Sequence, residues 1–203
     1  MNAKIIVFCL ITLTITANVG LTQEAPFHKN DFRMSYGKFT VSEVAIGMGE
    51  VFTSIGHHII HDSILSSSIT TFGSFAFQYQ RSFGKVVQIG GIITFQPIVS
   101  KTHYKNGDHT QTDSYNIFSL MPRIDFNYVN RGIFSMYSGF AMGLCMASYS
   151  HNYSWQPDVS GVAATVAFQL NVVGFRIGKE IGGFIEFGAG FQGFINLGIS
   201  ARL

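Results

Sequence analysis

Apolar residues occupy every second position along most of this chain. Between Phe72 and Arg81, for example, Phe75, Phe77 and Tyr79 alternate with small or polar residues. Successive side chains of a β-strand point to opposite faces, so a period of two predicts a strand whose two faces differ in chemistry. A chain dominated by this period is not a mainly helical protein. The remaining question is what each face contacts.

The alternation recurs in about eight stretches of roughly ten residues each. Eight strands is the smallest number known for a transmembrane barrel. These stretches are residues 31–37, 72–81, 87–96, 117–129, 134–146, 162–171, 185–191 and 195–203. Short connections at 81–85 and 130–132 alternate with long polar ones at 38–69, 98–114 and 149–160. We therefore predict an all-β fold, an eight-stranded antiparallel transmembrane β-barrel with long extracellular loops and short periplasmic turns.

Composition separates a membrane barrel from a soluble one. Hydrophobic residues make up 47% of the chain, charged residues only 12%, and the mean hydropathy is +0.27. A soluble barrel of the lipocalin kind would turn its apolar faces inward, but an interior of this size has no room for so many aromatic rings. We therefore expect lipid outside and packed polar side chains inside. The net charge of +2 gives no reason to expect a nucleic-acid partner.

The first residues have the pattern of a secretory signal peptide. Lys4 precedes an apolar run from Ile5 to Ile15, and small and polar residues follow. This run is too short to span a bilayer stably. We predict a signal peptide over residues 1–22, a periplasmic N-terminal segment over 23–30 and an outer-membrane β-barrel over 31–203, in a Gram-negative cell.

The few charges on the polar faces are expected to pair inside the barrel. Arg123 and Asp125 lie two positions apart on one strand face, and unpaired charges would be costly in a narrow interior. An ion-selective constriction is the functional alternative, but a diffusion pore needs about sixteen strands. The predicted lumen charge network consists of Arg33, Arg123, Asp125, Glu186 and Arg202.

Small inward residues gather toward the extracellular half of the strands, so the upper lumen is expected to be roomier than the lower. Residues 41–61 repeat apolar positions at three- and four-residue steps, which predicts an amphipathic helix. We expect this segment to fold into the upper lumen, although it could also lie on the membrane. An apolar ligand or lipid chain is the alternative occupant, and tight curvature alone is a third explanation. The possible pocket comprises Gly143, Cys145, Ala163, Thr165, Gly188 and Gly190.

Candidate catalytic chemistry is confined to a histidine-rich segment. His57 and His61 have the spacing of helical metal ligands, but Ile59 and Ile60 stand where a zinc-protease motif needs a glutamate. His58, Asp62 and Ser63 could form a hydrolytic triad, but neither template is complete. We therefore expect no catalytic residue, no metal and no cofactor. Cys9 lies in the signal, so the exported chain keeps Cys145 alone and forms no internal disulfide.

The C-terminal run 182–203, with residues 31–37 and 121–123, resembles small outer-membrane β-barrel proteins of Bacteroides-like bacteria, which are eight-stranded barrels of the OmpX and OmpA type. Leu203 stands where this family usually ends on an aromatic residue. The resemblance implies an outer-membrane location, with outer-membrane lipids and the barrel-assembly machinery as partners. It implies a structural or surface-interaction role, porin-like in architecture but without a transport pore. The alternatives are a lipid-modifying enzyme resembling lipid A deacylases or acyltransferases, and a binder of small apolar ligands.

Overall fold

The structure is a computed structural model that describes residues 28–48, 64–104, 110–153 and 157–203. Its strands are β1 (Asn30–Lys38), β2 (Ile64–Thr71), β3 (Ser74–Phe83), β4 (Val87–Tyr104), β5 (Thr110–Arg131), β6 (Phe134–Tyr153), β7 (Val159–Gly178), β8 (Ile181–Gly190) and β9 (Ile195–Arg202). Residues 41–48 are helical. Within the described residues no helix is long and apolar enough to cross a membrane, a finding that has no bearing on strands.

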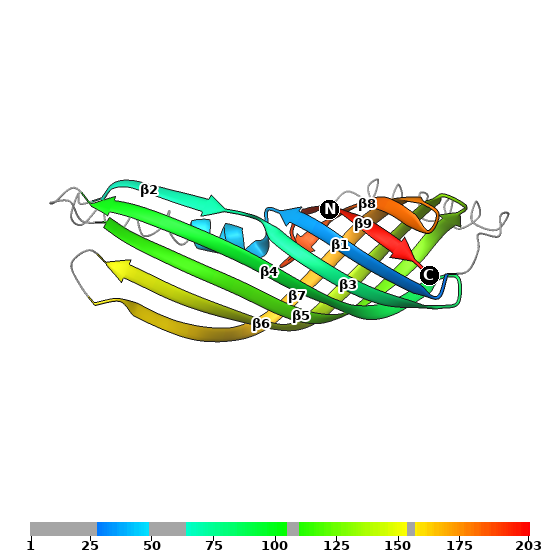
Figure 1. The fold of residues 1–203 in the computed structure, drawn as a ribbon, viewed down its shortest axis with the longest axis horizontal. Coiled ribbons are helices and arrows are strands. Elements are labelled where there is room, and N and C mark those ends of the chain that lie inside the picture. The colour runs from blue at the N-terminus through cyan, green and yellow to red at the C-terminus, as the bar shows by residue number, and fades with distance from the viewer. Residues whose placement is uncertain (1–27, 49–63, 105–109, 154–156) are drawn as a thin grey trace, which may run out of the picture.

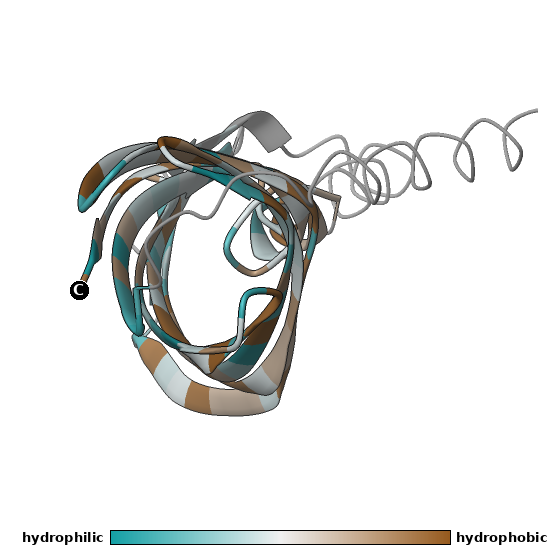
Figure 2. Ribbon diagram, turned by 90° about the vertical axis from the view of Figure 1, so that its right-hand side faces the viewer, coloured by the Kyte–Doolittle hydropathy of each residue, from teal (hydrophilic) through white to brown (hydrophobic). Residues whose placement is uncertain are grey.

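Eight of the strands close a ring in the order β1, β3, β4, β5, β6, β7, β8, β9, and β9 pairs with β1. Every pairing is antiparallel. Figure 2 shows this ring nearly end-on, with hydrophilic and hydrophobic residues alternating along the ribbons. The chain is thus an eight-stranded antiparallel β-barrel, as the period of two predicts.

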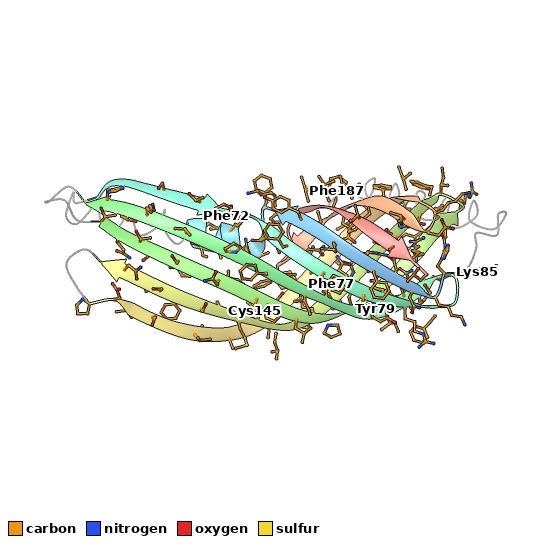
Figure 3. All side chains as sticks on the ribbon, in the orientation of Figure 1. Phe72, Phe77, Tyr79, Lys85, Cys145 and Phe187 are labelled. Carbon is orange, nitrogen blue, oxygen red and sulfur yellow. The ribbon has the colours of Figure 1, made fainter. Side chains whose placement is uncertain are left out.

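The two faces of the wall are those that the alternation predicts. The side chains of Phe77, Phe126 and Phe140 point outward and are 47%, 41% and 44% exposed, whereas Gln78 and Asp125 are completely buried. Figure 3 shows Phe77, Tyr79 and Phe187 on the outside of the ribbon. The predicted register of the strands is confirmed, because a slip of one residue would have exchanged the faces.

The strands of the ring differ greatly in length. β4 to β7 run far beyond the level at which β1, β8 and β9 end (Figure 1). β8 pairs with β7 only as far as Gln169, opposite Gly190. β2 lies beside β4 beyond the end of β3, where Thr71 pairs with Ile98. We call this extension the protruding sheet, made of residues 64–71, 98–104, 110–116, 148–153 and 159–162.

The outer face changes character where the protruding sheet begins. On β5 and β6, Phe118 pairs with Met146, and both are about half exposed apolar side chains. The next outward pair is Asn116 with Ser148. The apolar part of β5 continues from Phe118 to Tyr128, about the 9–11 residues with which a tilted strand crosses a bilayer. The ring therefore spans the membrane, and the protruding sheet lies outside the hydrocarbon.

Several stretches expected as loops are strands. The end of 38–69 and most of 98–114 and 149–160 belong to β2, β4, β5, β6 and β7. Most outward positions there are polar, such as Lys101, Ser114 and Ser150, so polar residues occupy both faces and the period of two disappears. The strand predicted at 162–171 is also longer than expected, because β7 continues to Gly178 and only Lys179 and Glu180 separate it from β8. We call this side of the barrel, with the turns at 84–86, 132–133 and 179–180, the turn end.

Candidate functional site

The centre of the lumen holds four charged side chains in mutual contact. Arg33 on β1 places Nη1 3.1 Å from Asp125 Oδ2 and 3.4 Å from Glu186 Oε1. Arg123 on β5 places Nε 2.8 Å from Asp125 Oδ1 and Nη2 2.6 Å from Glu186 Oε1. The side chains are 0–1% exposed. Two guanidinium groups and two carboxylates thus neutralise each other away from water, which is the condition for burying charges.

Neutral groups complete the bonding of these carboxylates. Tyr137 Oη donates to Glu186 Oε1 at 2.9 Å, and Asn171 Nδ2 donates to Glu186 Oε2 at 2.8 Å. Gln80 Nε2 donates to Asp125 Oδ2 at 2.7 Å. The guanidinium of Arg33 lies 4.5 Å from the centre of the Tyr137 ring, a cation–π contact. A network with this many bonds is rigid and fills the barrel.

A second ionic group lies nearer the turn end. Asp31 Oδ2 is 2.9 Å from Arg33 Nη2 and 3.1 Å from Arg202 Nε, so it bridges β1 and β9. Arg176 on β7 is 1% exposed and donates to Ser200 Oγ and to the carbonyl oxygens of Gly178 and Lys179. These bonds hold the turn after β7 against the barrel.

The structure places all five residues of the predicted charge network in the lumen and brings them together through shared carboxylates. Sequence reasoning missed two members. Asp31 is the second residue of β1, where the alternation had only begun. Arg176 lies beyond the predicted strand at 162–171, although Phe175 and Ile177 beside it already show the strand period.

The upper lumen is apolar and is covered by the helix at 41–48. Eight buried residues form the apolar layer: Ala76, Ile92, Ile98, Ile117, Met121, Ala141, Cys145 and Ala167. Ile46 of the helix and Phe191 of the β8–β9 connection pack against this layer. Two other apolar side chains of the helix point away from this layer, because Val44 and Met48 are 44% and 54% exposed. The rest of the predicted helix, from residue 49, lies outside the described residues.

The helix is fixed by its first turn. Thr40 Oγ1 accepts the backbone N–H of Glu43 at 3.1 Å, and Glu43 Oε2 accepts the backbone N–H of Thr40 at 3.0 Å. This reciprocal arrangement is a capping box. Gln96 of β4 accepts hydrogen bonds from Thr40 and Ser42 at 3.0 and 2.7 Å, which docks the helix on the wall. The Thr-x-x-Glu spacing was a sequence signal for this helix start that the sequence analysis overlooked.

The six residues of the possible pocket do not enclose one space. Ala163 and Thr165 lie on the exposed part of β7, beyond the last pair with β8. Cys145 is 1% exposed within the apolar layer. Gly143, Gly188 and Gly190 lie against the backbones of β5 and β7, where a Cβ would collide. Close contact between strands accounts for these glycines, and the helix accounts for the space above them.

The histidine-rich segment 57–63 lies outside the described residues. His151 lies in the stretch 149–160, which was expected to be a loop, but it is on β6 with Nδ1 2.7 Å from Asp113 Oδ1. The Tyr149 ring lies 5.3 Å from the His151 ring. Within residues 28–48, 64–104, 110–153 and 157–203, no three His, Cys, Asp or Glu side chains are grouped as metal ligands.

No protein-family model matches the chain, and no curated protein matches it. Among solved structures, the barrel is similar to the crystal structure of Ail, the attachment invasion locus protein of Yersinia pestis. The TM-score is 0.43 at 10% sequence identity, over 86% of this chain and 97% of Ail. The expected kinship with proteins of Bacteroides-like bacteria stays a prediction. The signal peptide at 1–22 also stays a prediction, because it lies outside the described residues.

Proposed function

We propose that this protein is an integral outer-membrane barrel that holds its protruding sheet outside the cell as an interaction surface and has no enzymatic activity. In this proposal the turn end faces the periplasm, outer-membrane lipids surround the ring, and the barrel-assembly machinery inserts it. The observation that carries the proposal is the change of the outer face from Phe118 and Met146 to Asn116 and Ser148 in the middle of continuous strands.

The length of the strands beyond that point supports an interaction role. β4 and β5 remain paired for a further stretch, from Pro97 opposite Asn116 to His103 opposite Thr110. A barrel that only had to span the bilayer could turn at the rim, as β8 and β9 do. The protruding sheet also has two edges without a neighbouring described strand, β2 and the upper part of β7. Such edges offer unpaired backbone groups to a partner.

The filling of the lumen argues against transport. The ionic network closes the ring at its centre, and the apolar layer with Ile46 and Phe191 closes it above. Eight-stranded barrels generally have interiors just wide enough for side chains. The barrel therefore serves as an anchor, and its activity is expected at the protruding sheet.

Cysteine labelling tests the orientation. Lys101, at the outer face of the protruding sheet, and Lys85, in the turn after β3 (Figure 3), are both exposed. On intact cells a membrane-impermeant maleimide should label the K101C variant and should leave K85C unlabelled until the cells are broken. The native Cys145 is buried and provides the background. Labelling of K85C alone on intact cells would refute the proposed orientation.

Shortening one hairpin tests the interaction role. Ser100 pairs with Asp113, so residues 101–112 can be replaced by a two-residue turn without changing the register. The shortened protein should still fold as a heat-modifiable barrel, whereas binding of the cells to panels of immobilised proteins and glycans should be lost. The K85Q variant, altered at the opposite end, is the control. Unchanged binding by the shortened protein would contradict the proposal.

A further inference from the structure

The buried charges of the barrel do not balance. Among the described residues, the buried charged side chains are the four arginines Arg33, Arg123, Arg176 and Arg202 and the three carboxylates Asp31, Asp125 and Glu186. Arg33 and Arg123 are matched by Asp125 and Glu186, and Asp31 is matched by Arg202. Four positive and three negative groups leave one positive charge in excess. Buried charges are normally paired, because removal from water is costly.

The excess lies at the turn end. Arg176 reaches Ser200, which is two positions before Arg202 on the same inward face of β9. Among the described residues, the hydrogen bonds of Arg176 all go to neutral oxygens, namely Ser200 Oγ and the carbonyl groups of 178–180. Carbonyl dipoles offset part of a charge, but they do not cancel it. The region around Arg202 is therefore positive.

A small cavity opens at this place. It has a volume of about 20 Å³, and its lining includes Ser82, Lys85, Gln88, Asn127, Asn130 and Arg202. A cavity of roughly 10–15 Å³ is enough for one water-sized particle. Asp31, the carboxylate on Arg202, does not line the cavity. The lining is thus polar and cationic.

A buried donor lines the cavity without a partner. Arg202 is 6% exposed; its Nε binds Asp31 and its Nη1 binds Ser135 Oγ, while its Nη2 has no hydrogen-bond partner among the described residues. Unsatisfied buried donors are rare in folded proteins and commonly mark an absent water or ion. The unpartnered donor and the excess positive charge together favour an anion, and the size of the cavity limits it to a small one.

We propose that this cavity binds one small inorganic anion of the halide class, held by Nη2 of Arg202 and by the excess positive charge of Arg176 and Arg202. A water molecule would satisfy the donor but would leave the excess charge in place. A bulky organic anion would not enter a cavity of about 20 Å³. The anion completes the charge balance of the lumen and does not depend on the proposed role of the protruding sheet.

The test compares urea unfolding of the barrel, refolded in detergent micelles, in sodium chloride and in sodium gluconate of equal ionic strength. A ligand that binds only the folded state shifts the unfolding midpoint along a saturable curve. We expect a higher midpoint in chloride, saturating with concentration, and the same gain in bromide. Equal midpoints in chloride and gluconate would show that the cavity holds water only and would overturn the proposal.

Replacing the anion by a fixed charge makes the test specific. Asn127 is 8% exposed and its Oδ1 has no hydrogen-bond partner, so N127D places a carboxylate in the cavity with little change of shape. This variant should lose the chloride dependence, whereas N116D, the same change on the protruding part of β5, should keep it. If N127D does not fold, N130D, which adds a carboxylate to the same lining, should lose the chloride dependence instead. Full chloride dependence in the variant that is measured would overturn the proposal.

Discussion

The closed ring and the protruding sheet are built from the same strands but follow different rules. In the ring, β5 and β6 turn Phe118, Phe126 and Phe140 to lipid and bury Asp125 and Tyr137. In the protruding sheet, outward positions of the same two strands carry Asn116, Ser148 and Ser150. The surroundings, and not the strand itself, determine which face is apolar. A period of two in the sequence therefore marks the part of a strand that has lipid on one side.

Ionic pairs show the same difference between the regions. Glu186 in the ring is completely buried and receives bonds from Arg33, Arg123, Tyr137 and Asn171. The side chains of the Asp113–His151 pair in the protruding sheet are 13% and 24% exposed. Buried networks specify the structure strongly because each member depends on the others, whereas pairs near water contribute little.

The largest expected effect comes from the buried network. Glu186→Gln preserves shape but leaves Arg33 and Arg123 with one carboxylate fewer. Removing one partner of a buried ion pair costs about 3–5 kcal/mol of the free energy of unfolding. Urea unfolding of the barrel in lipid vesicles measures it. A double variant with Arg123→Met and Glu186→Leu should recover part of the lost stability. If Glu186→Gln costs less than a surface substitution, the network is not charged.

The lipid-facing wall should give the next largest effect. Phe140 pairs with Ile124 near the middle of the apolar belt, so Phe140→Arg should cost about 2–4 kcal/mol of unfolding free energy in vesicles. Ser148→Arg, eight residues further along the same strand, should change it by about 0–1 kcal/mol because it lies at or beyond the membrane boundary. Equal costs at both positions would place the boundary of the membrane elsewhere.

A smaller and local effect is expected at the helix in the upper lumen. Thr40→Ala removes the capping box and the bonds to Gln96. Loss of an N-cap costs about 0.5–2 kcal/mol, and here it should appear as faster amide exchange at Val44, whose N–H donates to the carbonyl of Thr40. Val41→Ala, which keeps the cap, is the control. Unchanged exchange at Val44 would show that the cap does not hold the helix.

The smallest effect should be found in the protruding sheet. His151→Asn removes the contact with Asp113, and a partly solvated ion pair contributes about 0.2–1 kcal/mol. The change in unfolding free energy should therefore be several-fold smaller than that of Glu186→Gln, measured in the same vesicles. A loss of similar size would mean that the protruding sheet is as strongly coupled as the ring.

The ring could be predicted from the sequence because lipid imposes a pattern on it. The period of two alone predicted which way the side chains of Phe77, Gln78 and Asp125 point. The protruding sheet could not, since β2 and the outer parts of β4 to β7 are polar on the outside and resemble loops. The charge network was visible as isolated charges on polar faces, but the pairing of Asp31 with Arg202 depends on ring closure, which no local pattern specifies.

The contact between β1 and β9 is the seam that closes the ring, because it joins the first and the last strand of the barrel. It comprises eight paired positions, against seventeen between β4 and β5, and it brings together residues far apart in the chain, so it is the contact with the largest entropic cost of closure. Asp31 is the register partner of Arg202 and also its ion-pair partner. A slip of one position would turn Arg202 toward lipid. The ion pair between Asp31 and Arg202 therefore favours the correct register when β1 and β9 close the barrel.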